Sequence, residues 1–367
     1  MGALKIPQAR MYWAKHTAVV PLVCESMKRD RFFEVRSNLH FVDDNDSVDK
    51  TDKLWKVRPM LDTVQKACLE LPKSNHLSID EQMIPFSGKC VARQYVPSKP
   101  NPLGLKNFIL ASKDGLVLDF VIYQGKGTVP EDDVKTFGLG GAIVKRLVES
   151  IKNPNYQQVI YTDRYFTGIK IAEYLLSKEI YSTGTVMSNR TQSGAQKFPS
   201  DNTMVRGDYV ELCRSDDKMT VKWKDKKTVL MLSTLCGIEP SDKCRRWSKP
   251  DNKKIDVPRP ACVRLYNTYM GGIDLQDRFI ALYRTRYLDQ LDPTRTITDY
   301  DHPRTRQQEM KTEDYTEDRL QKKTDPSYPE LGAASVIPIY LNTFLMATAY
   351  ERPVVGVRDS TSFLASG

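Results

Sequence analysis

The chain has 367 residues, 40% hydrophobic and 28% charged, which suffices for one large domain with an insertion or for two domains. Its formal net charge of +9 favours a polyanionic partner, and the excess lies before residue 288, because residues 288–330 are net acidic. The seven cysteines contain no C-x2-C pair, so neither a zinc module nor a disulfide framework is indicated, and reduced thiols inside a cell are expected.

No segment is expected to target or cross a membrane. Residues 1–10 lack the apolar core of a signal peptide. The apolar stretch at residues 336–350 contains Pro338 and Asn342 and is shorter than the roughly 20 residues that a spanning helix needs.

Residues 1–75 are predicted to be helical. Apolar side chains at Val57, Leu61, Val64, Cys68 and Leu71 recur every three or four residues. This spacing predicts one buried face of an amphipathic helix.

From residue 77 onward, short apolar runs typical of strands replace the helical pattern. Strands are predicted at residues 77–86, 105–112, 116–123, 158–162 and 180–186, with helices at 140–151 and 169–176. The Pro- and Lys-rich residues 94–106 predict a stiff loop. Strands alternating with helices in this order predict an α/β fold with a mixed sheet flanked by helices.

The later residues divide into an insertion, a helix and a polar end. Residues 188–258 are predicted to be a β-rich insertion with its own small β layer, formed by strands at 206–213, 219–224 and 228–233. Residues 265–287 predict a helix that is interrupted or begins at Gly271 and Gly272, and residues 288–330 are expected to be disordered or poorly packed. The resulting units are 1–75, 76–187, 188–258, 259–287 and 288–367.

Four aspartates occupy unusual positions in this pattern. Asp80 lies inside an apolar strand, Asp163 ends another, and Asp274 and Asp277 follow the glycine pair on one helical face. A buried carboxylate is costly unless it is paired, hydrogen-bonded or bound to a metal. Taken singly, each aspartate is better explained as a capping or salt-bridged residue. Asp80 and Asp163 would be neighbours if their strands pair, and we interpret Asp80, Asp163 and Asp274 as a convergent divalent-metal site.

Basic residues next to tryptophan form the second candidate site. Basic side chains interleaved with aromatic rings suit phosphate contact and base stacking. A flexible basic loop or part of a nuclear targeting signal explains residues 243–254 about as well. The candidate DNA-binding residues are Lys99, Lys106, Arg164, Lys222, Lys224, Arg245, Arg246, Lys249, Lys253 and Lys254.

Six blocks of residues carry a family resemblance. They are residues 77–86; Gln94-Tyr95-x-Pro97-x-Lys99-Pro100 with Gly104-x-Lys106; Tyr161-Thr162-Asp163 with Phe166-Thr167; residues 181–186 with Asn189-Arg190; Lys222-Trp223-Lys224-Asp225; and Tyr266-Asn267-x-Tyr269-Met270-Gly271-Gly272-x-Asp274-x-x-Asp277. Their joint order, over residues 8–287, resembles the piggyBac-type transposases and the proteins domesticated from them.

The resemblance implies a ribonuclease H-like fold with a β-rich insertion before the last acidic residue, and an N-terminal helical region used for dimerisation or DNA binding. It implies that Asp80, Asp163 and Asp274 are catalytic, with Asp277 nearby. Cleavage and rejoining of DNA phosphodiesters suit two Mg2+ (or Mn2+) ions about 4 Å apart, held by carboxylates, with Asp80 expected to bridge them. The implied partners are transposon ends, a TTAA target and a second copy of the chain, in the nucleus.

The chain departs from the family at two places. Arg164 stands where the family commonly has Asn, and after Arg286 the expected Trp-rich helix and Cys/His-rich zinc module have no counterpart, so no zinc site is expected. Three interpretations stay open: an active transposase core, a domesticated DNA- or chromatin-binding protein that does not cut, and a truncated, non-functional element copy.

Overall fold

The computed structural model describes residues 12–13, 21–38, 40–43, 49–86, 90–97, 99, 101–151, 157–191, 194–214 and 219–283. The prediction for residues 288–367 lies outside the described residues, as does part of that for residues 1–75. In these ranges no helix combines the length and the apolar character needed to cross a membrane.

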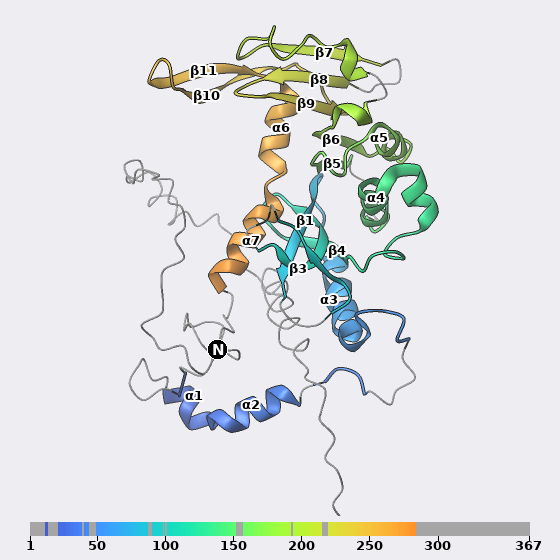
Figure 1. Ribbon diagram of the computed structural model, residues 1–367, viewed down its shortest axis with the longest axis vertical. Coiled ribbons are helices and arrows are strands. Elements are labelled where there is room, and N and C mark those ends of the chain that lie inside the picture. The colour runs from blue at the N-terminus through green and yellow to red at the C-terminus, as the bar shows by residue number, and fades with distance from the viewer. Residues whose placement is uncertain are drawn as a thin grey trace, which may run out of the picture.

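The described elements are helices at both ends of the order, with strands and further helices between them (Figure 1). The helices are α1 (Pro21–Ser26), α2 (Arg29–Ser37), η2 (Trp55–Val57), α3 (Arg58–Glu70), α4 (Glu131–Val148), α5 (Ile169–Leu176), η3 (Ser188–Arg190), η4 (Gly194–Lys197), α6 (Ala261–Tyr269) and α7 (Gly272–Tyr283). The strands are β1 (His76–Pro85), β2 (Arg93–Tyr95), β3 (Leu103–Ser112), β4 (Val117–Ile122), β5 (Val159–Thr162), β6 (Tyr181–Thr185), β7 (Tyr209–Cys213), β8 (Met219–Lys224), β9 (Thr228–Ser233), β10 (Asp242–Ser248) and β11 (Lys253–Arg259).

A nine-stranded mixed sheet forms the centre of the molecule. Its order is β2-β3-β1-β5-β6-β9-β8-β7, with β4 also paired to β3. Strand β1 is antiparallel to β3 and parallel to β5, and β5 is parallel to β6 through the crossover helix α5. The mixed α/β prediction is therefore confirmed, and the condition that β1 pairs with β5 is met.

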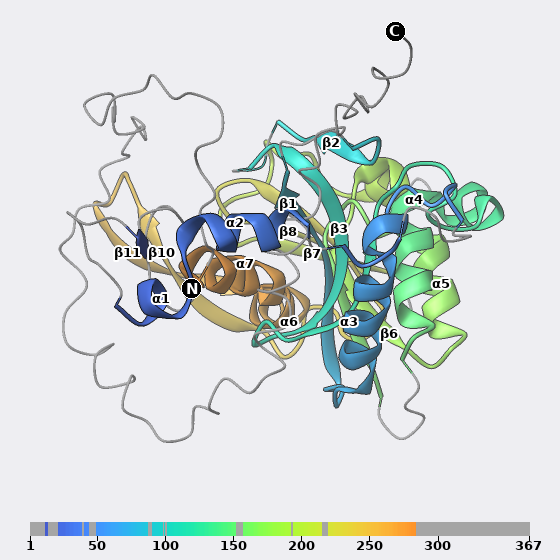
Figure 2. The same ribbon diagram turned by 90° about the horizontal axis from the view of Figure 1, so that it is seen from below.

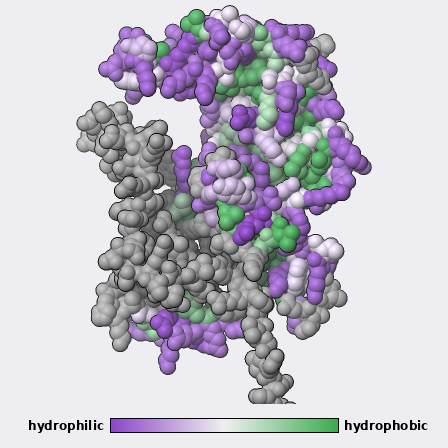
Figure 3. Space-filling model, in the orientation of Figure 1, coloured by the Kyte–Doolittle hydropathy of each residue, from purple (hydrophilic) through white to green (hydrophobic). Residues whose placement is uncertain are grey.

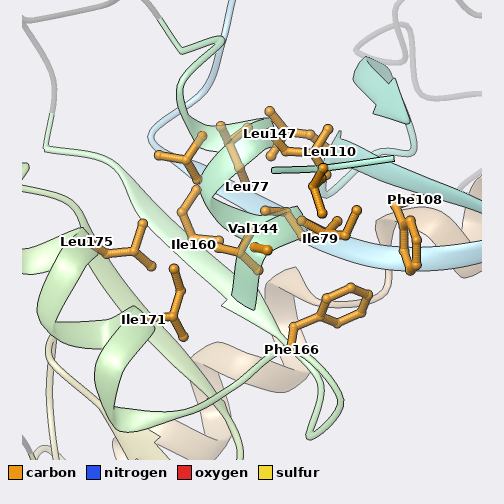
Figure 4. Close-up of a cluster of buried hydrophobic side chains, with 14 of the residues drawn as sticks. Leu77, Ile79, Phe108, Leu110, Val144, Leu147, Ile160, Phe166, Ile171 and Leu175 are labelled. Carbon is orange, nitrogen blue, oxygen red and sulfur yellow. The ribbon is translucent and has the colours of Figure 1, made fainter. Parts of the chain in front are cut away.

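Apolar residues of β1 that alternate in sequence bury one face of this sheet. Leu77 and Ile79 pack with Ile160 of β5 against Val144 of α4 and Ile171 of α5 (Figure 4). Since side chains alternate between the two faces of a strand, Asp80 projects from the opposite face.

Helices α3, α6 and α7 cover the opposite face. Leu61 of α3 and Ile273 of α7 share a buried cluster with Ile109 of β3, whereas Met270, at the end of α6, packs on Val159 of β5. Figures 1 and 2 both show α7 on one side of β1 and β3 and α4 with α5 on the other.

Two predictions for the insertion and the stiff loop are wrong. The β7–β9 meander extends the main sheet instead of forming its own layer, because β9 pairs with β6, whose edge would otherwise leave backbone groups unpaired. Residues 94–106, expected to be a loop, include the end of β2 and the start of β3.

The basic segment at residues 243–254 belongs to a β-hairpin, which corrects the loop interpretation. Strand β10 pairs with β11, and Cys244 and Val257 turn inward onto the insertion core. This inward pair sets the register of the hairpin. Figure 1 shows the hairpin projecting sideways from the end of the molecule that carries β7–β9.

Candidate functional site

Asp80 projects from the middle of β1 toward α6 and α7. Two residues that share its face identify the direction: His76 stacks on Tyr269 of α6 with ring centroids 4.0 Å apart, and Gln82 donates a hydrogen bond to Asp277 of α7. The half-buried Asp80 carboxylate lies between these contacts, on the face where the helices approach the sheet.

The environment of Asp80 disfavours an unpaired negative charge. Burial is the main cause that raises the pKa of its carboxyl to about 7, and the charge of Asp163 raises it further, while the backbone N–H of Glu81, 2.8 Å from Oδ1, and the charge of Lys99 oppose the increase. A carboxylate held in such an environment gains from a nearby cation.

Asp163 lies beside Asp80 as a result of parallel pairing. Ile79 is in register with Thr162, so the next position on each chain brings Asp80 and Asp163 side by side. Burial raises the pKa of the Asp163 carboxyl, and the hydrogen bond from the Tyr165 backbone N–H, 2.8 Å from Oδ1, acts in the opposite direction.

The turn after Asp163 is held by one contact from another segment and one within the turn. Arg190 donates to the carbonyl oxygen of Tyr165 at 2.5 Å, and the Thr167 hydroxyl donates to the carbonyl oxygen of Asp163 at 2.8 Å. A Cβ on Gly184 of β6 would lie 2.4 Å from the carbonyl oxygen of Thr162, so the close packing of β6 on β5 requires glycine.

The other two aspartates begin α7. The predicted 265–287 helix is two helices, α6 and α7, with Gly271 between them. A Cβ on Gly272 would lie 2.2 Å from the carbonyl oxygen of Ser112, so glycine lets the start of α7 pack directly on β3. Asp274 follows in the first turn and is exposed, and Asp277 lies one turn later on the same face.

Asp277 bonds to β1 through Gln82. Although solvent reaches the Asp277 side chain, loss of hydration around the carboxyl raises its pKa, and the charge of Asp274 also raises it. The Gln82 amide, whose Nε2 lies 2.6 Å from Oδ1, acts in the opposite direction.

Tyr266 of α6 lies close to three of the aspartates. Burial is the largest cause that raises the pKa of its phenol to about 12, and the charges of Asp163, Asp80 and Asp274 each add to it. A hydrogen bond with Thr185 opposes the shift. The three carboxylates, separated by many residues in the chain, therefore all lie near enough to Tyr266 for their charges to raise its pKa.

The donor set is suited to a hard divalent cation, although it is not assembled as a closed ligand shell. Within the described ranges, no three or more His, Cys, Asp or Glu side chains are arranged to hold a metal ion as they stand. Asp80, Asp163 and Asp274 nevertheless offer carboxylate oxygens, the ligands that Mg2+ and Mn2+ prefer. The raised pKa of Asp80 marks negative charge that burial leaves poorly compensated. The fit thus rests on donor chemistry and charge.

Lys99 and Lys106 both form ion pairs with Glu81. Its carboxylate oxygens lie 2.9 Å from Nζ of Lys106 and 3.5 Å from Nζ of Lys99. Lys106 also lies 4.6 Å from the centre of the Tyr165 ring. These two predicted DNA-binding residues are therefore ion-paired with the residue that follows Asp80.

The other predicted DNA-binding residues divide into engaged and exposed groups. Lys222 pairs with Asp201 at 2.6 Å, Lys224 donates to the Asp201 carbonyl oxygen at 3.0 Å, and Arg246 pairs with Asp225 at 3.0 Å. Five predicted residues are exposed: Arg164, Arg245, Lys249, Lys253 and Lys254.

Sequence patterns did not single out Gln82, Glu81 or Tyr266. Gln82 and Glu81 had one available signal, their place next to Asp80 in an apolar strand. For Tyr266 the only signal was its place in the block that ends at Asp277. None of these signals reveals a partner across the fold.

Comparisons with known proteins agree with this architecture. The family model described as "Transposase IS4" matches residues 1–294. PiggyBac transposable element-derived protein 3 of Homo sapiens is 31% identical over 291 residues, covering 77% of this chain and 48% of that protein. PiggyBac transposable element-derived protein 2 of Homo sapiens is 29% identical over 292 residues, covering 78% and 48%. The chain thus spans about half the length of these relatives.

The fold is also similar to a solved structure. A cryo-EM structure of a piggyBac transposase synaptic complex with hairpin DNA matches with a TM-score of 0.62 and 24% identity, over 77% of this chain and 56% of that one. The expected ribonuclease H-like core, with its mixed sheet flanked by helices, is confirmed by this match. The chain belongs to the piggyBac-type transposase family.

Proposed function

We propose that Asp80, Asp163 and Asp274 form a DDD-type transposase core that cuts and rejoins DNA phosphodiesters. The observation that carries this proposal is the side-by-side placing of Asp80 and Asp163 by two parallel strands, with the helix that carries Asp274 bonded to the same strand through Gln82 and Asp277. Asp80 would contribute to both of two divalent metal sites, and Asp163 and Asp274 to one each. Bound Mg2+ or Mn2+ would supply activation of the attacking oxygen and stabilisation of the leaving oxygen.

Lys99 and Lys106 form ion pairs with Glu81. The charge of Lys99 nevertheless acts on Asp80 and Asp163, where it opposes the rise in the pKa of both carboxyls. The Asp163 turn is fixed by Arg190 through backbone contacts, without a direct ion pair to the carboxylate.

DNA contact is assigned to the exposed face of the β10–β11 hairpin. Lys243, Arg245 and Trp247 alternate along β10, and Trp247 pairs across the ribbon with Lys254. These four side chains are exposed, Trp247 to 51%, and Asp256 is the acidic residue on the same face. Cationic groups beside an exposed ring suit phosphate contact with base or sugar stacking. Figure 3 shows hydrophilic residues over this projecting hairpin.

The DNA sequences that are recognised, the oligomeric state and the cellular location also belong to the proposal. Transposon ends, a TTAA target, a second copy of the chain and a nuclear location are what the family resemblance implies. The solved neighbour is a transposase in a complex with DNA, which supports DNA as the partner here.

A cleavage assay tests the proposal. A donor plasmid with the terminal repeats that flank the gene is incubated with the protein and Mg2+ or Mn2+. Metal-dependent cleavage that Asp163→Asn abolishes is expected. Asp132→Asn, on an exposed α4 side chain, is the matched control and retains cleavage. Cleavage that survives Asp163→Asn contradicts the proposed site.

DNA binding without cleavage is the second candidate function. The basic hairpin is formed by strands that contain none of the four aspartates, so it can hold DNA whether or not the core cuts. DNA retention that persists without metal, with an uncut donor, would support a domesticated binding protein. Loss of both activities would support a non-functional element copy.

A further inference from the structure

Two contacts hold α7 on the sheet: the close packing of Gly272 on β3 and a hydrogen bond from the Gln82 side-chain amide of β1 to Asp277. Gln82 is 3% exposed, lies two residues after Asp80 on the same strand face, and places Nε2 2.6 Å from Oδ1 of Asp277. Asp277 follows Asp274 by one helical turn. This hydrogen bond therefore joins the strand that carries the first proposed catalytic carboxylate to the helix that carries the third.

The anchor matters because Asp274 is exposed and lies between two fixed points of α7. On its N-terminal side, Gly272 packs against the carbonyl oxygen of Ser112, where even a Cβ would not fit. On its C-terminal side, Asp277 is bonded to Gln82. A helix fixed on both sides of one residue gives that residue a defined position without a bond of its own.

The chemistry of an amide suits this task better than that of a charged or apolar side chain. A lysine at the Gln82 position would pair with Asp277 and reduce the negative charge of the site, and a leucine would leave Asp277 unbound. An amide N–H instead orients a carboxylate and leaves its charge available.

We propose that Gln82 is a positioning residue that holds Asp277 and through it sets the place of Asp274. The proposal rests on the metal-dependent function proposed above. It assigns Gln82 no contact with DNA or with the reacting atoms.

The test compares Mn2+ binding and cleavage in matched variants. Mn2+ binding is followed by electron paramagnetic resonance on the DNA-free protein, and cleavage is followed as a function of Mn2+ concentration. Gln82→Leu should raise the half-saturating Mn2+ concentration by roughly tenfold or more, since partners of metal-site ligands have effects of that size. The control is Gln65→Leu, which deletes a similar bond of 2.7 Å to Asp119, away from the site. It should lower the melting temperature and leave the Mn2+ midpoint unchanged.

A double-mutant cycle separates positioning from a general loss of stability. If Gln82 acts through Asp277, Gln82→Leu combined with Asp277→Asn should lose no more than Asp277→Asn alone. Gln82→Asn, which keeps the amide but shortens its reach to Asp277, is a milder change that should shift the midpoint in the same direction, and it serves if Gln82→Leu does not fold.

The outcomes are distinct. Wild-type protein that neither binds Mn2+ nor cuts DNA overturns the proposed function and this inference with it. Wild-type protein that does both, with an unchanged midpoint in Gln82→Leu and Gln82→Asn, overturns the positioning role alone. Additive losses in the cycle also overturn it.

Discussion

The acidic site and the basic hairpin place their charges in opposite ways. The aspartates come from β1, the end of β5 and the start of α7, segments far apart in the chain, and burial raises the pKa of Asp80 and Asp163. The hairpin collects its cations from one local segment, 242–259, and exposes most of them, whereas Arg246 and Arg259 form ion pairs. The first arrangement costs folding free energy, because burial disfavours charge, whereas the second costs little.

The contrast also separates cations that hold the fold from cations that are open to a partner. Lys106, Lys222 and Arg246 form ion pairs with Glu81, Asp201 and Asp225. Arg245 and Lys254 project from the exposed hairpin face. A count of basic residues in sequence does not distinguish these two kinds.

The largest expected effect separates cutting from binding. Asp80→Asn should reduce metal-dependent cleavage by about three orders of magnitude or more, because the proposed reaction would lose a carboxylate that would serve both metal sites. DNA retention in a gel-shift assay should remain. If retention is lost together with cleavage, the two regions do not act independently.

A pair of neighbouring glycines tests how closely α7 must approach the sheet. Gly272→Ala places a Cβ 2.2 Å from the Ser112 carbonyl oxygen, and overpacking of this kind costs about 1–3 kcal/mol. We expect a lower melting temperature and slower cleavage. Gly271→Ala is the matched control, because nothing lies within 4 Å of its Cβ. Equal effects of the two changes would contradict the close-packing argument.

The hairpin should contribute affinity that depends on salt. Arg245→Ala with Lys254→Ala should weaken DNA binding and lower the slope of log K against log salt by about one for each lost phosphate contact. Lys222→Ala, in the engaged group, should leave that slope unchanged. Binding is measured by fluorescence anisotropy at several salt concentrations. Equal slopes in all variants would show that the hairpin does not contact DNA phosphates.

The smallest effect concerns stability and pH. The pKa of Asp80 is raised from its ordinary value of 3.8 to about 7, so the folded state binds the proton more tightly than the unfolded state. Proton binding to Asp80 therefore stabilises the folded state. This stabilisation is fully present below about pH 4 and is lost as the pH rises through about 7. In metal-free buffer the melting temperature should therefore fall across this range, and Asp163 and Asp277 have the same sign.

Asp80→Asn should flatten that fall. It should raise the melting temperature at pH 8 by about 2–4 °C for each kcal/mol of relieved destabilisation. Asp132→Asn, whose side chain is 93% exposed, should leave the profile unchanged. A profile in Asp80→Asn identical to that of the wild type would mean that Asp80 does not carry the shifted proton.

Local sequence was sufficient to predict much of the sheet. The strands at residues 219–224 and 228–233 and the helix at 169–176 have the predicted bounds, because apolar spacing reflects which side of a segment is buried. The unusual position of Asp80 was visible for the same reason: a carboxylate in an apolar run stands out. The same pattern grouped Asp163 and Asp274 with Asp80, and the family resemblance implied a catalytic role for the three, with Asp277 nearby.

Only the tertiary structure decided which groups meet. The pairing of β9 with β6 and the bond from Gln82 to Asp277 join segments far apart in the chain. The ion pairs of Glu81 with Lys99 and Lys106 also join residues that are separated in the chain. Periodicity reports the burial of a segment but not its neighbour, since many strand edges and helix faces are equally apolar. The choice among them is made by packing at sites such as Gly184 and Gly272, where a single Cβ would prevent the contact.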